Sequence, residues 1–435
     1  MKKLFTLFTV ALLLMVALVP VMAQDAAEVT FRCYQDGTEC DVLSELLAAF
    51  EEANPDVDVI VDIVPYQTID EQLPIQVEAG EAPDIARVTN FGVYQGFYLD
   101  LTPYLDEETA AAWEANFPAP VLAAMSNDGA GDTLSGFPDL FSVTAPFINR
   151  TLFEQAGVAV PSDENPEASW QDWTAAAAEV AAALSDGEFQ VYAVAIDRTG
   201  HRFAGPAMSM GATLINDEGS FTVDTEGFRM MAELLKSWHD DSITPVEVWL
   251  GSGGSYAAAA DFFINGQLAV YMSGSWQVGR FGRDIADAFD WEVVPNPTGE
   301  GGSTGIAGGS GIIAFEGAEN PEAVARVMAY LVQPEVYSEY SARILSLPAH
   351  SEVAEAGVDF QTDNEAVAEA LNTFAAEIPK LQDQAVALNV HPFAFAYYRN
   401  SADRLTQYIV GELSLEEALT NLQEDIDAAI AEAQS

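Results

Sequence analysis

The first third of the chain alternates short apolar strands with helical repeats. Residues 28–32 and 57–63 have the apolar and β-branched character of strands, and apolar side chains recur at helical spacing over residues 43–50 between them. A third short strand is expected from residue 85. This β-α-β-α-β order favours a parallel sheet with helices on its faces, so we expect an α/β fold.

The rest of the chain continues this pattern. Residues 136–149 (GFPDLFSVTAPFIN) lack a helical period and are long enough to cross between two domains, whereas the glycine-rich residues 296–310 predict a loop. Hydroxyl residues three positions before acidic ones predict capping boxes at Thr68, Ser169 and Ser414. Strands are expected at 191–196, 268–272, 291–294 and 311–315, and helices at 170–184, 228–238 and from Pro321 and Pro334.

Residues 261–276 (DFFINGQLAVYMSGSW) combine a helix end, a strand and an aromatic residue. Asn265-Gly266 ends the helix, and residues 268–272 form the strand. Ligands of open α/β sheets bind outside the carboxyl ends of strands, which is where Trp276 falls. Trp276 is either the floor of a ligand site or a core tryptophan at a strand end, and spacing alone does not separate the two.

The length and the N-terminus indicate an exported protein with two lobes. A chain of 435 residues exceeds one ordinary core. Residues 1–23 have the basic start, apolar run and small-residue cleavage site of a secretory signal peptide, with an uncleaved anchor as the alternative. No later stretch is apolar for long enough to span a bilayer.

Cys33 and Cys40 are the only cysteines. An even count in an exported chain favours one disulfide, which would stabilise the fold by about 2 kcal/mol through loop closure; two buried free thiols are the alternative. We expect no metal site, because none of the four histidines has ligand spacing to another histidine or to a cysteine.

Acidic residues outnumber basic ones by 68 to 16, which gives a formal net charge of −52. Like charge disfavours nucleic acid and anionic membranes as partners. A hydrophobic content of 49% rules out a disordered acidic chain. The charge weakly favours a neutral or cationic ligand, although salt screens it beyond about 10 Å.

Enzyme motifs are scarce. Residues 301–305 fit G-x-S-x-G but lie in a glycine-rich loop rather than on the strand-to-helix turn that a nucleophile elbow needs. The chain has no P-loop, HExxH or CxxC motif, so we expect no cofactor and no enzymatic activity.

An ordered set of motifs resembles the extracellular solute-binding proteins of ABC transporters, in the family-one sugar-binding group that includes maltose-binding protein. The resemblance covers nearly all of the chain after residue 23. Its motifs are FEEANPDVDV, EAGEAPDIARV, YLDLTPYL, FPDLFSVTAPFINRTLFEQAGV, SWQDW, FFINGQLAVYMSGSW, VVPNPTGEGG, NPEAVARVMAYLVQPE and LSLPAHSEV.

The resemblance implies a type II periplasmic-binding-protein fold, in which two α/β lobes clamp a ligand and close by a hinge. Crossings would fall near residues 141–144, 292–295 and 346–350. Lobe one would comprise residues 24–140 and 294–345. Lobe two would comprise residues 141–293 and 346–435.

The resemblance also implies the site residues. The first-strand loop commonly bonds sugar hydroxyls, and Trp276 matches a stacking aromatic, because an aromatic plane can bury the apolar face of a sugar ring. A carboxylate of maltodextrin-binding members is replaced here by Ser142. Arg198, His201 and Arg202 either contact the ligand or pair with carboxylates. The predicted set is Tyr34, Gln35, Asp36, Gln67, Thr89, Asn90, Phe91, Phe141, Ser142, Trp249, Tyr256, Trp276, Gly309, Ser310, Phe395 and Tyr398.

These features predict a monomeric, periplasmic or extracellular binding subunit that captures a mono- or oligosaccharide and delivers it to ABC transporter permease subunits. Polyols, glycerol phosphate and polyamines are the alternative ligands. A secreted glycan-active enzyme and an adhesin are the alternatives of another class.

Overall fold

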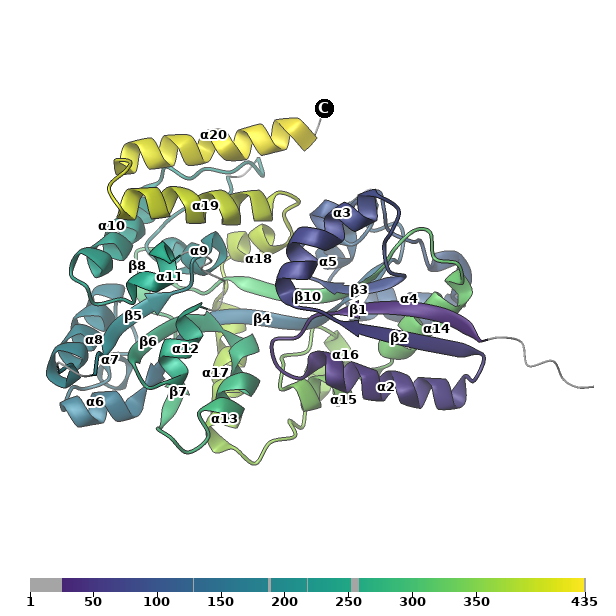
Figure 1. Ribbon diagram of the computed structural model, residues 1–435, viewed down its shortest axis with the longest axis horizontal. Coiled ribbons are helices and arrows are strands. Elements are labelled where there is room, and N and C mark those ends of the chain that lie inside the picture. The colour runs from purple at the N-terminus through teal and green to yellow at the C-terminus, as the bar shows by residue number, and fades with distance from the viewer. Residues whose placement is uncertain (1–25, 128, 187–188, 217, 252–257, 434–435) are drawn as a thin grey trace, which may run out of the picture.

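A single long strand, β4 (Gly136–Asn149), passes through the middle of the molecule and joins its two halves (Figure 1). The structure is a computed structural model that describes residues 26–433 except 128, 187–188, 217 and 252–257. The strand has the bounds that the sequence predicted, and all of its residues except Phe141 are buried. Its apolar content explains this burial, because a strand covered on both faces has no polar side.

The N-terminal half of β4 belongs to a mixed sheet. Strand β1 (Ala27–Cys33) lies parallel to β2 (Val57–Ile63) and β3 (Ile85–Val88). Strand β10 (Ala307–Ala314) lies antiparallel between β3 and β4. The carboxyl ends of β1 and β3 therefore meet at one edge, where a parallel sheet offers a ligand crevice.

The C-terminal half of β4 pairs with β6 (Leu268–Gly274) on one side and β7 (Trp291–Val293) on the other. Strand β5 (Tyr192–Ile196) is parallel to β6. The whole sheet has the order β2-β1-β3-β10-β4-β6-β5, with β7 attached to β4. A separate hairpin joins β8 (Thr298–Gly299) and β9 (Gly302–Ser303).

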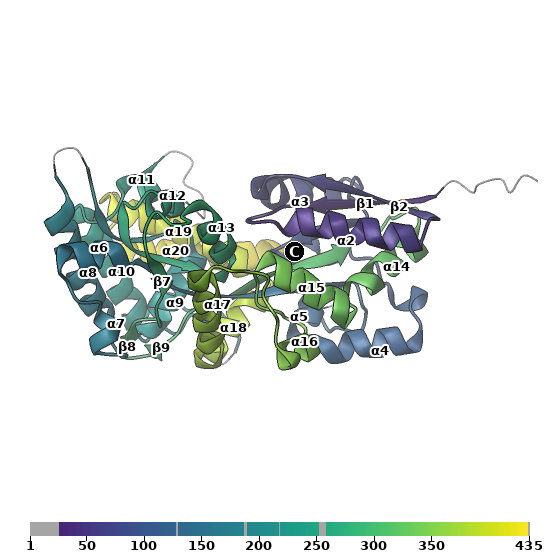
Figure 2. The ribbon, with the colours of Figure 1, turned by 90° about the horizontal axis from the view of Figure 1, so that it is seen from below.

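Helices surround both halves, which lie side by side in both views (Figures 1 and 2). Around the β1–β3 half lie α2 (Glu39–Ala53), η1 (Thr68–Gln72), α3 (Leu73–Glu78), η2 (Gly92–Tyr94), η3 (Thr102–Tyr104), α4 (Glu107–Asn116), α5 (Ala119–Ala124), α14 (Pro321–Leu331), α15 (Pro334–Ile344) and α16 (Ser351–Ala356). Around the β5–β7 half lie α6 (Arg150–Ala156), α7 (Pro161–Glu164), α8 (Trp170–Leu184), α9 (Gly200–Ser209), α10 (Glu226–Asp240), α11 (Val246–Leu250), α12 (Ala258–Ile264), η4 (Ser275–Gln277), α13 (Val278–Asp284), α17 (Glu365–Glu377), η5 (Ile378–Lys380), α18 (Asp383–Val390), α19 (Ala394–Ile409) and α20 (Leu415–Ala433).

The buried apolar side chains form separate cores in the two halves. One core holds residues from Val143 to Ile306, Leu347 and residues from Val367 onward. Two smaller clusters hold residues of β1, β3, the start of β4, the end of β10, α14 and α15. The lobe boundaries after residues 140, 293 and 345 stay a prediction. Because Val294 and Ile306 pack in the larger core, we propose that the second passage between halves lies at β10.

Two local expectations are corrected. The glycine-rich residues 296–310 are not a plain loop, because they contain the β8–β9 hairpin and the start of β10. Thr68 does not cap a helix, since residues 68–72 form a π-helical turn without a side-chain cap. The capping boxes at Ser169 and Ser414 are confirmed.

The predicted signal peptide lies outside the described residues. Among the residues that the structure describes, no helix is long and apolar enough to cross a membrane.

Candidate ligand-binding site

A cavity of about 730 Å³, counting the part open to solvent, lies between the two halves. Its walls come from strand ends of the first half, the paired strands β4 and β10, and helices of the second half. The lining residues are Tyr34, Asp36, Tyr66, Arg87, Thr89, Leu140, Ser142, Thr199, His201, Arg202, Trp276, Gly308, Gly309, Ser310, Asn389, Phe395 and Tyr398.

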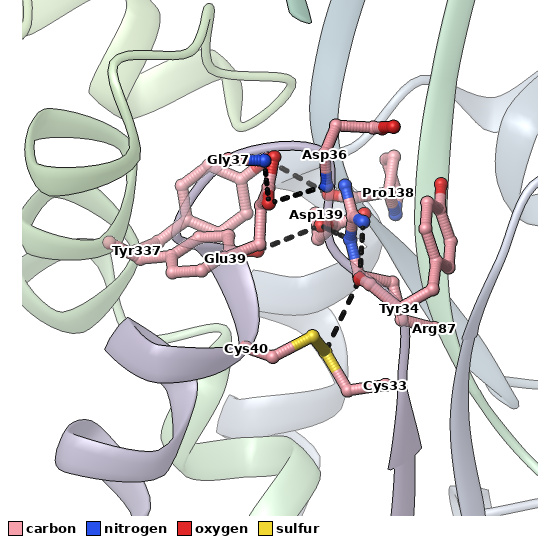
Figure 3. Close-up of polar contacts among 11 residues, drawn as sticks. Cys33, Tyr34, Asp36, Gly37, Glu39, Cys40, Arg87, Pro138, Asp139 and Tyr337 are labelled. Atoms are coloured by element: carbon pink, nitrogen blue, oxygen red, sulfur yellow. Dashed lines mark hydrogen bonds and ion pairs between the residues drawn. A yellow bond between two sulfur atoms is a disulfide. The ribbon is translucent and has the colours of Figure 1, made fainter. Parts of the chain in front are cut away.

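The loop between β1 and α2 carries Tyr34 and Asp36 to one wall (Figure 3). The buried carboxylate of Glu39 accepts the backbone N–H groups of Asp36, at 3.0 Å, and Gly37, at 2.9 Å. Burial raises the pKa of Glu39, and the charge of Arg87 opposes that shift. Two backbone bonds to one carboxylate fix the conformation of the loop before any ligand arrives.

A disulfide closes the same loop. Cys33 at the end of β1 is bonded to Cys40 in α2, which confirms the predicted pair (Figure 3). The described residues contain no free cysteine. The two cavity residues of the loop therefore lie inside a covalent ring.

Arg87 of β3 supports the wall from behind. Its Nε lies 2.8 Å from Asp139 Oδ2, and both side chains are almost fully buried. Its NH1 group donates to the Tyr34 carbonyl at 2.8 Å, and its guanidinium lies 4.2 Å from the centre of the Tyr34 ring. Tyr340 also donates to Asp139, at 3.0 Å. A buried arginine is stable only with such partners, so this network sets the position of Tyr34.

The first turn of α9 forms the opposite wall. His201 Nε2 lies 3.1 Å from the Ala307 carbonyl, and Arg202 NH1 lies 2.8 Å from His201 Nδ1. A carbonyl only accepts and a guanidinium only donates, so the imidazole carries its proton on Nε2. Burial and the neighbouring Arg202 hold the pKa of His201 well below its usual range, which keeps the ring neutral.

Trp276 lies between Gly274 and Arg202. A Cβ atom at Gly274 would fall 2.1 Å from Trp276 Cζ3, so only glycine permits this ring position. The Arg202 guanidinium lies 4.1 Å from the centre of the Trp276 ring. This is van der Waals distance, so the guanidinium and a sugar ring cannot occupy the same face together.

The floor of the cavity is made by β4 and β10. Gly308 pairs with Ser142, and a Cβ at Gly308 would lie 2.7 Å from Ser142 Oγ and 3.2 Å from His201 Nε2. Ser310 Oγ is buried and has no hydrogen-bond partner within the described part of the chain. The same holds, among the described residues, for Tyr398 OH and Trp276 Nε1. Buried polar groups normally have partners, and these three cavity-lining residues are exceptions within the described part of the chain.

The structure brings many of the predicted site residues together. Those that line the cavity are Tyr34, Asp36, Thr89, Ser142, Trp276, Gly309, Ser310, Phe395 and Tyr398. Tyr256 lies outside the described residues. The other predicted residues do not line the cavity: Gln35, Gln67, Asn90, Phe91, Phe141 and Trp249.

Local packing explains these exclusions. Trp249 is 1% exposed and donates its Nε1 to the Ile196 carbonyl at 2.8 Å, so it is a core residue. Phe91 lies in the core of the first half, and Phe141 packs against the core of the second. Gln67 donates to Glu71 on its own turn, at 2.9 Å.

Sequence reasoning missed several lining residues, including Tyr66, Arg87, Thr199 and Asn389. Arg87 had a detectable signal, because a charge inside an apolar strand must find a buried partner. Asn389 had none, since a helix far along the chain reaches the cavity only through the tertiary fold. In the described part of the chain, no group of three or more His, Cys, Asp or Glu residues could hold a metal ion.

Comparisons with known proteins agree with this architecture. Residues 37–337 match the model of the bacterial extracellular solute-binding protein family. A Brucella abortus (strain 2308) protein, named only as a candidate binding protein, is 25% identical over 329 residues, 74% of this chain and 75% of its own.

Solved structures share the fold at lower identity. An ABC substrate-binding protein of Listeria monocytogenes in complex with cycloalternan has a TM-score of 0.72 at 20% identity, over 94% of this chain and all of its own. The GacH receptor of Streptomyces glaucescens GLA.O has a TM-score of 0.73 at 23% identity, over 92% of this chain and 97% of its own.

An α/β molecule with two halves and a cavity between them has the architecture of the periplasmic binding proteins, which confirms the predicted fold class. The chain belongs to the bacterial extracellular solute-binding protein family. It is therefore an extracellular solute-binding protein, and this family is not enzymatic, as the sequence predicted.

Proposed function

We propose that the protein binds a carbohydrate in this cavity and delivers it to an ABC importer. The observation that carries the proposal is the cavity lining: aromatic rings together with buried donors that have no partner among the described residues. A sugar has apolar faces that rings can cover and hydroxyls that such donors can reach.

The polar groups come from both sides of the cavity. Asp36 offers carboxylate oxygens on one wall, whereas Trp276 Nε1 and Tyr398 OH offer donors on the other. A ligand rich in hydroxyls can satisfy both walls at once, because each hydroxyl donates and accepts. An apolar ligand would leave Trp276 Nε1 and Tyr398 OH without a partner among the described residues, at a cost of about 1–3 kcal/mol each. We propose the cavity-lining members of the predicted set as ligand contacts.

Contacts between the two halves support the proposal that the halves close around the ligand. Arg399 of α19 donates to Asp70 of η1 at 2.8 Å. A Cβ at Gly92 would lie 2.6 Å from the Pro392 carbonyl, so the backbones of the two halves meet there. Hinge closure around a ligand is the motion that this class of protein uses.

The structural relatives bind carbohydrates by their descriptions. The Streptomyces receptor was solved with acarbose, and a Thermotoga lettingae solute-binding protein was solved with α-D-tagatose (TM-score 0.73, 16% identity, 93% of this chain and 99% of its own). We extend this ligand class to the present chain. We also propose export through the signal peptide at residues 1–23, and docking of the closed form on the permease subunits as a monomer.

A ligand panel tests the proposal. The protein without residues 1–23 is titrated with mono- and oligosaccharides, polyols, glycerol phosphate and polyamines, and binding is followed by calorimetry and melting temperature. We expect saturable binding of one sugar class without turnover. Trp276→Ala should weaken that binding at least tenfold, because it removes a ring and a donor. The control is Tyr104→Ala, an exposed aromatic that does not line the cavity.

Two outcomes would contradict the proposal. Binding of a polyamine or glycerol phosphate in place of every sugar would overturn the carbohydrate assignment. Equal losses in the Trp276 and Tyr104 variants would place the ligand outside this cavity.

A further inference from the structure

Arg87 and Arg202 line the cavity, and each covers an aromatic ring of its lining. The guanidinium of Arg202 lies 4.1 Å from the centre of the Trp276 ring. The guanidinium of Arg87 lies 4.2 Å from the centre of the Tyr34 ring. A sugar that stacks on a ring needs a similar van der Waals distance from it. The two covered faces are therefore closed to a sugar while the arginines keep these positions.

The other face of Trp276 is occupied by backbone. A Cβ atom at Gly274 would lie 2.1 Å from Trp276 Cζ3, 2.2 Å from Cη2 and 2.8 Å from Cε3. Short distances to three successive ring atoms place Gly274 over the plane of the ring and not beside its edge. Gly274 and the Arg202 guanidinium cannot share one face at these distances, so they take opposite faces. Trp276 therefore meets the cavity by its edge.

Several contacts keep Arg202 on the ring. Arg202 is 8% exposed, and its NH1 group lies 2.8 Å from His201 Nδ1. His201 Nε2 in turn lies 3.1 Å from the Ala307 carbonyl of β10. A guanidinium that moved away would lose a charge-assisted hydrogen bond and its contact with the ring. Arg202 is thus a fixed part of the wall.

Aromatic side chains extend this wall from α9 to α19. Edge-to-face contacts run between neighbouring rings whose centres are 6.3, 5.2 and 5.4 Å apart, in the order Trp276, His201, Tyr398 and Phe395. All four residues line the cavity. The row defines the length of wall along which a sugar can lie.

The two halves touch next to the α19 end of this row. Arg399, which follows Tyr398 in α19, pairs with Asp70 of η1 at 2.8 Å. Just before α19, the Pro392 carbonyl oxygen would lie 2.6 Å from a Cβ atom at Gly92. A ligand that extended past this end would have to separate these contacts. The row is thus covered by Arg202 at one end and closed by the first half at the other.

We infer that the site takes a single sugar unit, and that Arg202 sets this limit by occupying the face of Trp276 on which a second sugar ring would stack. The inference rests on the proposed function and narrows its ligand from mono- or oligosaccharides to monosaccharides. Each further unit of an oligosaccharide needs an apolar surface for its ring and partners for its hydroxyls. Because the row is bounded at both ends, a second unit finds no such place on it.

Sugars of increasing length test the inference. D-glucose, D-galactose, D-mannose and D-xylose are each compared with a disaccharide and a trisaccharide of the same unit by calorimetry. We expect one monosaccharide to bind the wild-type protein at least about tenfold more tightly than its own disaccharide and trisaccharide.

Two variants separate the bulk of Arg202 from its charge. Arg202→Ala uncovers the Trp276 ring and should reduce the preference for the monosaccharide at least about tenfold, because the disaccharide gains a stacking surface. Arg202→Met keeps an unbranched side chain that can cover the ring, so it should keep the preference. Arg198→Ala is the control, because Arg198 pairs with Asp403 and does not line the cavity.

Each result has one meaning. A disaccharide or trisaccharide that binds the wild-type protein as tightly as its monosaccharide overturns the inference and leaves the proposed function standing. Binding of no sugar of any length overturns both. The wild-type comparison decides the limit to one unit even if Arg202→Ala does not fold. A folded Arg202→Ala protein with the wild-type preference would overturn the role of Arg202, and so would an equal loss of preference in Arg202→Met or Arg198→Ala.

Discussion

Burial of a single ionisable residue affects the stability of this protein, and Asp197 is the example. Its side chain is fully buried at the end of β5, and burial raises its pKa to about 7 in spite of the Arg202 charge. In an unfolded chain an aspartate titrates near pH 3.9. The folded state therefore binds more protons between these two pH values, and stability falls as pH rises through about 7.

We predict that Asp197→Asn flattens this pH dependence. Between pH 5 and pH 8 the wild-type protein should lose on the order of 2 kcal/mol of unfolding free energy that the variant keeps. Chemical denaturation at the two pH values measures the difference, with the exposed Asp287→Asn as the control. Parallel pH profiles for wild type and Asp197→Asn would show that Asp197 is ionised in the folded protein throughout this range.

The residue scale also shows where sequence reasoning succeeds and fails. Trp276 and Ser142 were placed by position in a strand or at its end, and the cavity contains both. The ring of Trp249 alone suggests a ligand contact, but the fold buries that ring, and its N–H donates to the Ile196 carbonyl. Aromatic identity does not reveal exposure, which depends on neighbours from distant segments.

At the scale of elements, the β1–α2 loop joins a covalent ring to the cavity wall. The disulfide and the Glu39 carboxylate both act on the loop that carries Tyr34 and Asp36. Such a loop pays less conformational entropy when a ligand binds. The order of this loop before binding therefore contributes to the affinity for the ligand.

We predict that removing the disulfide weakens binding as well as stability. Cys33→Ser/Cys40→Ser should unfold about 2 kcal/mol more easily and bind the ligand about tenfold more weakly, because the loop must then be ordered on binding. Melting and calorimetry measure the two effects. A reducing agent should reproduce them in the wild type and do nothing to the double variant, since the chain has no other cysteine. Unchanged affinity in the double variant would show that the loop is ordered without the bond.

The strands show why the sequence predicts the bounds of some elements and not of others. Residues 57–63 and 136–149 are dense in β-formers, and both match β2 and β4 in their bounds. β10 begins with Ala307-Gly308-Gly309-Ser310, which has low β-propensity, so the sequence predicts a loop at its start. Pairing with β4 imposes this strand, and pairing between distant segments leaves no local pattern.

At the scale of the whole molecule, the two halves meet through an ion pair beside the cavity. Arg399 and Asp70 are 57% and 23% exposed, so the pair is partly screened by solvent. Its atoms belong to different halves and separate when the halves part. The pair should therefore stabilise the closed form and slow the release of ligand.

We predict that Arg399→Gln speeds ligand dissociation about two- to fivefold and leaves association nearly unchanged. Stopped-flow fluorescence measures both rates. Arg326→Gln is the control, because Arg326 pairs with Asp56 within one half. Asp70→Asn should have no further effect in the Arg399→Gln background. An equal change in the Arg326 variant would assign the effect to surface charge in general.

The shared strand β4 has a consequence for how occupancy is sensed. β4 and β10 are paired from residues 136 to 143, with a register shift at Ser310/Gly311, and the cavity floor residues Ser142 and Gly308 lie on this ladder. Relative rotation of the halves must twist these strands, so the floor changes shape as the angle between the halves changes. A bound molecule thus contacts the strands that join the two halves, and not only the walls on either side of the cavity. A ligand of the right width would fix the twist of these strands, and with it the angle between the halves that the proposed transporter partner would meet.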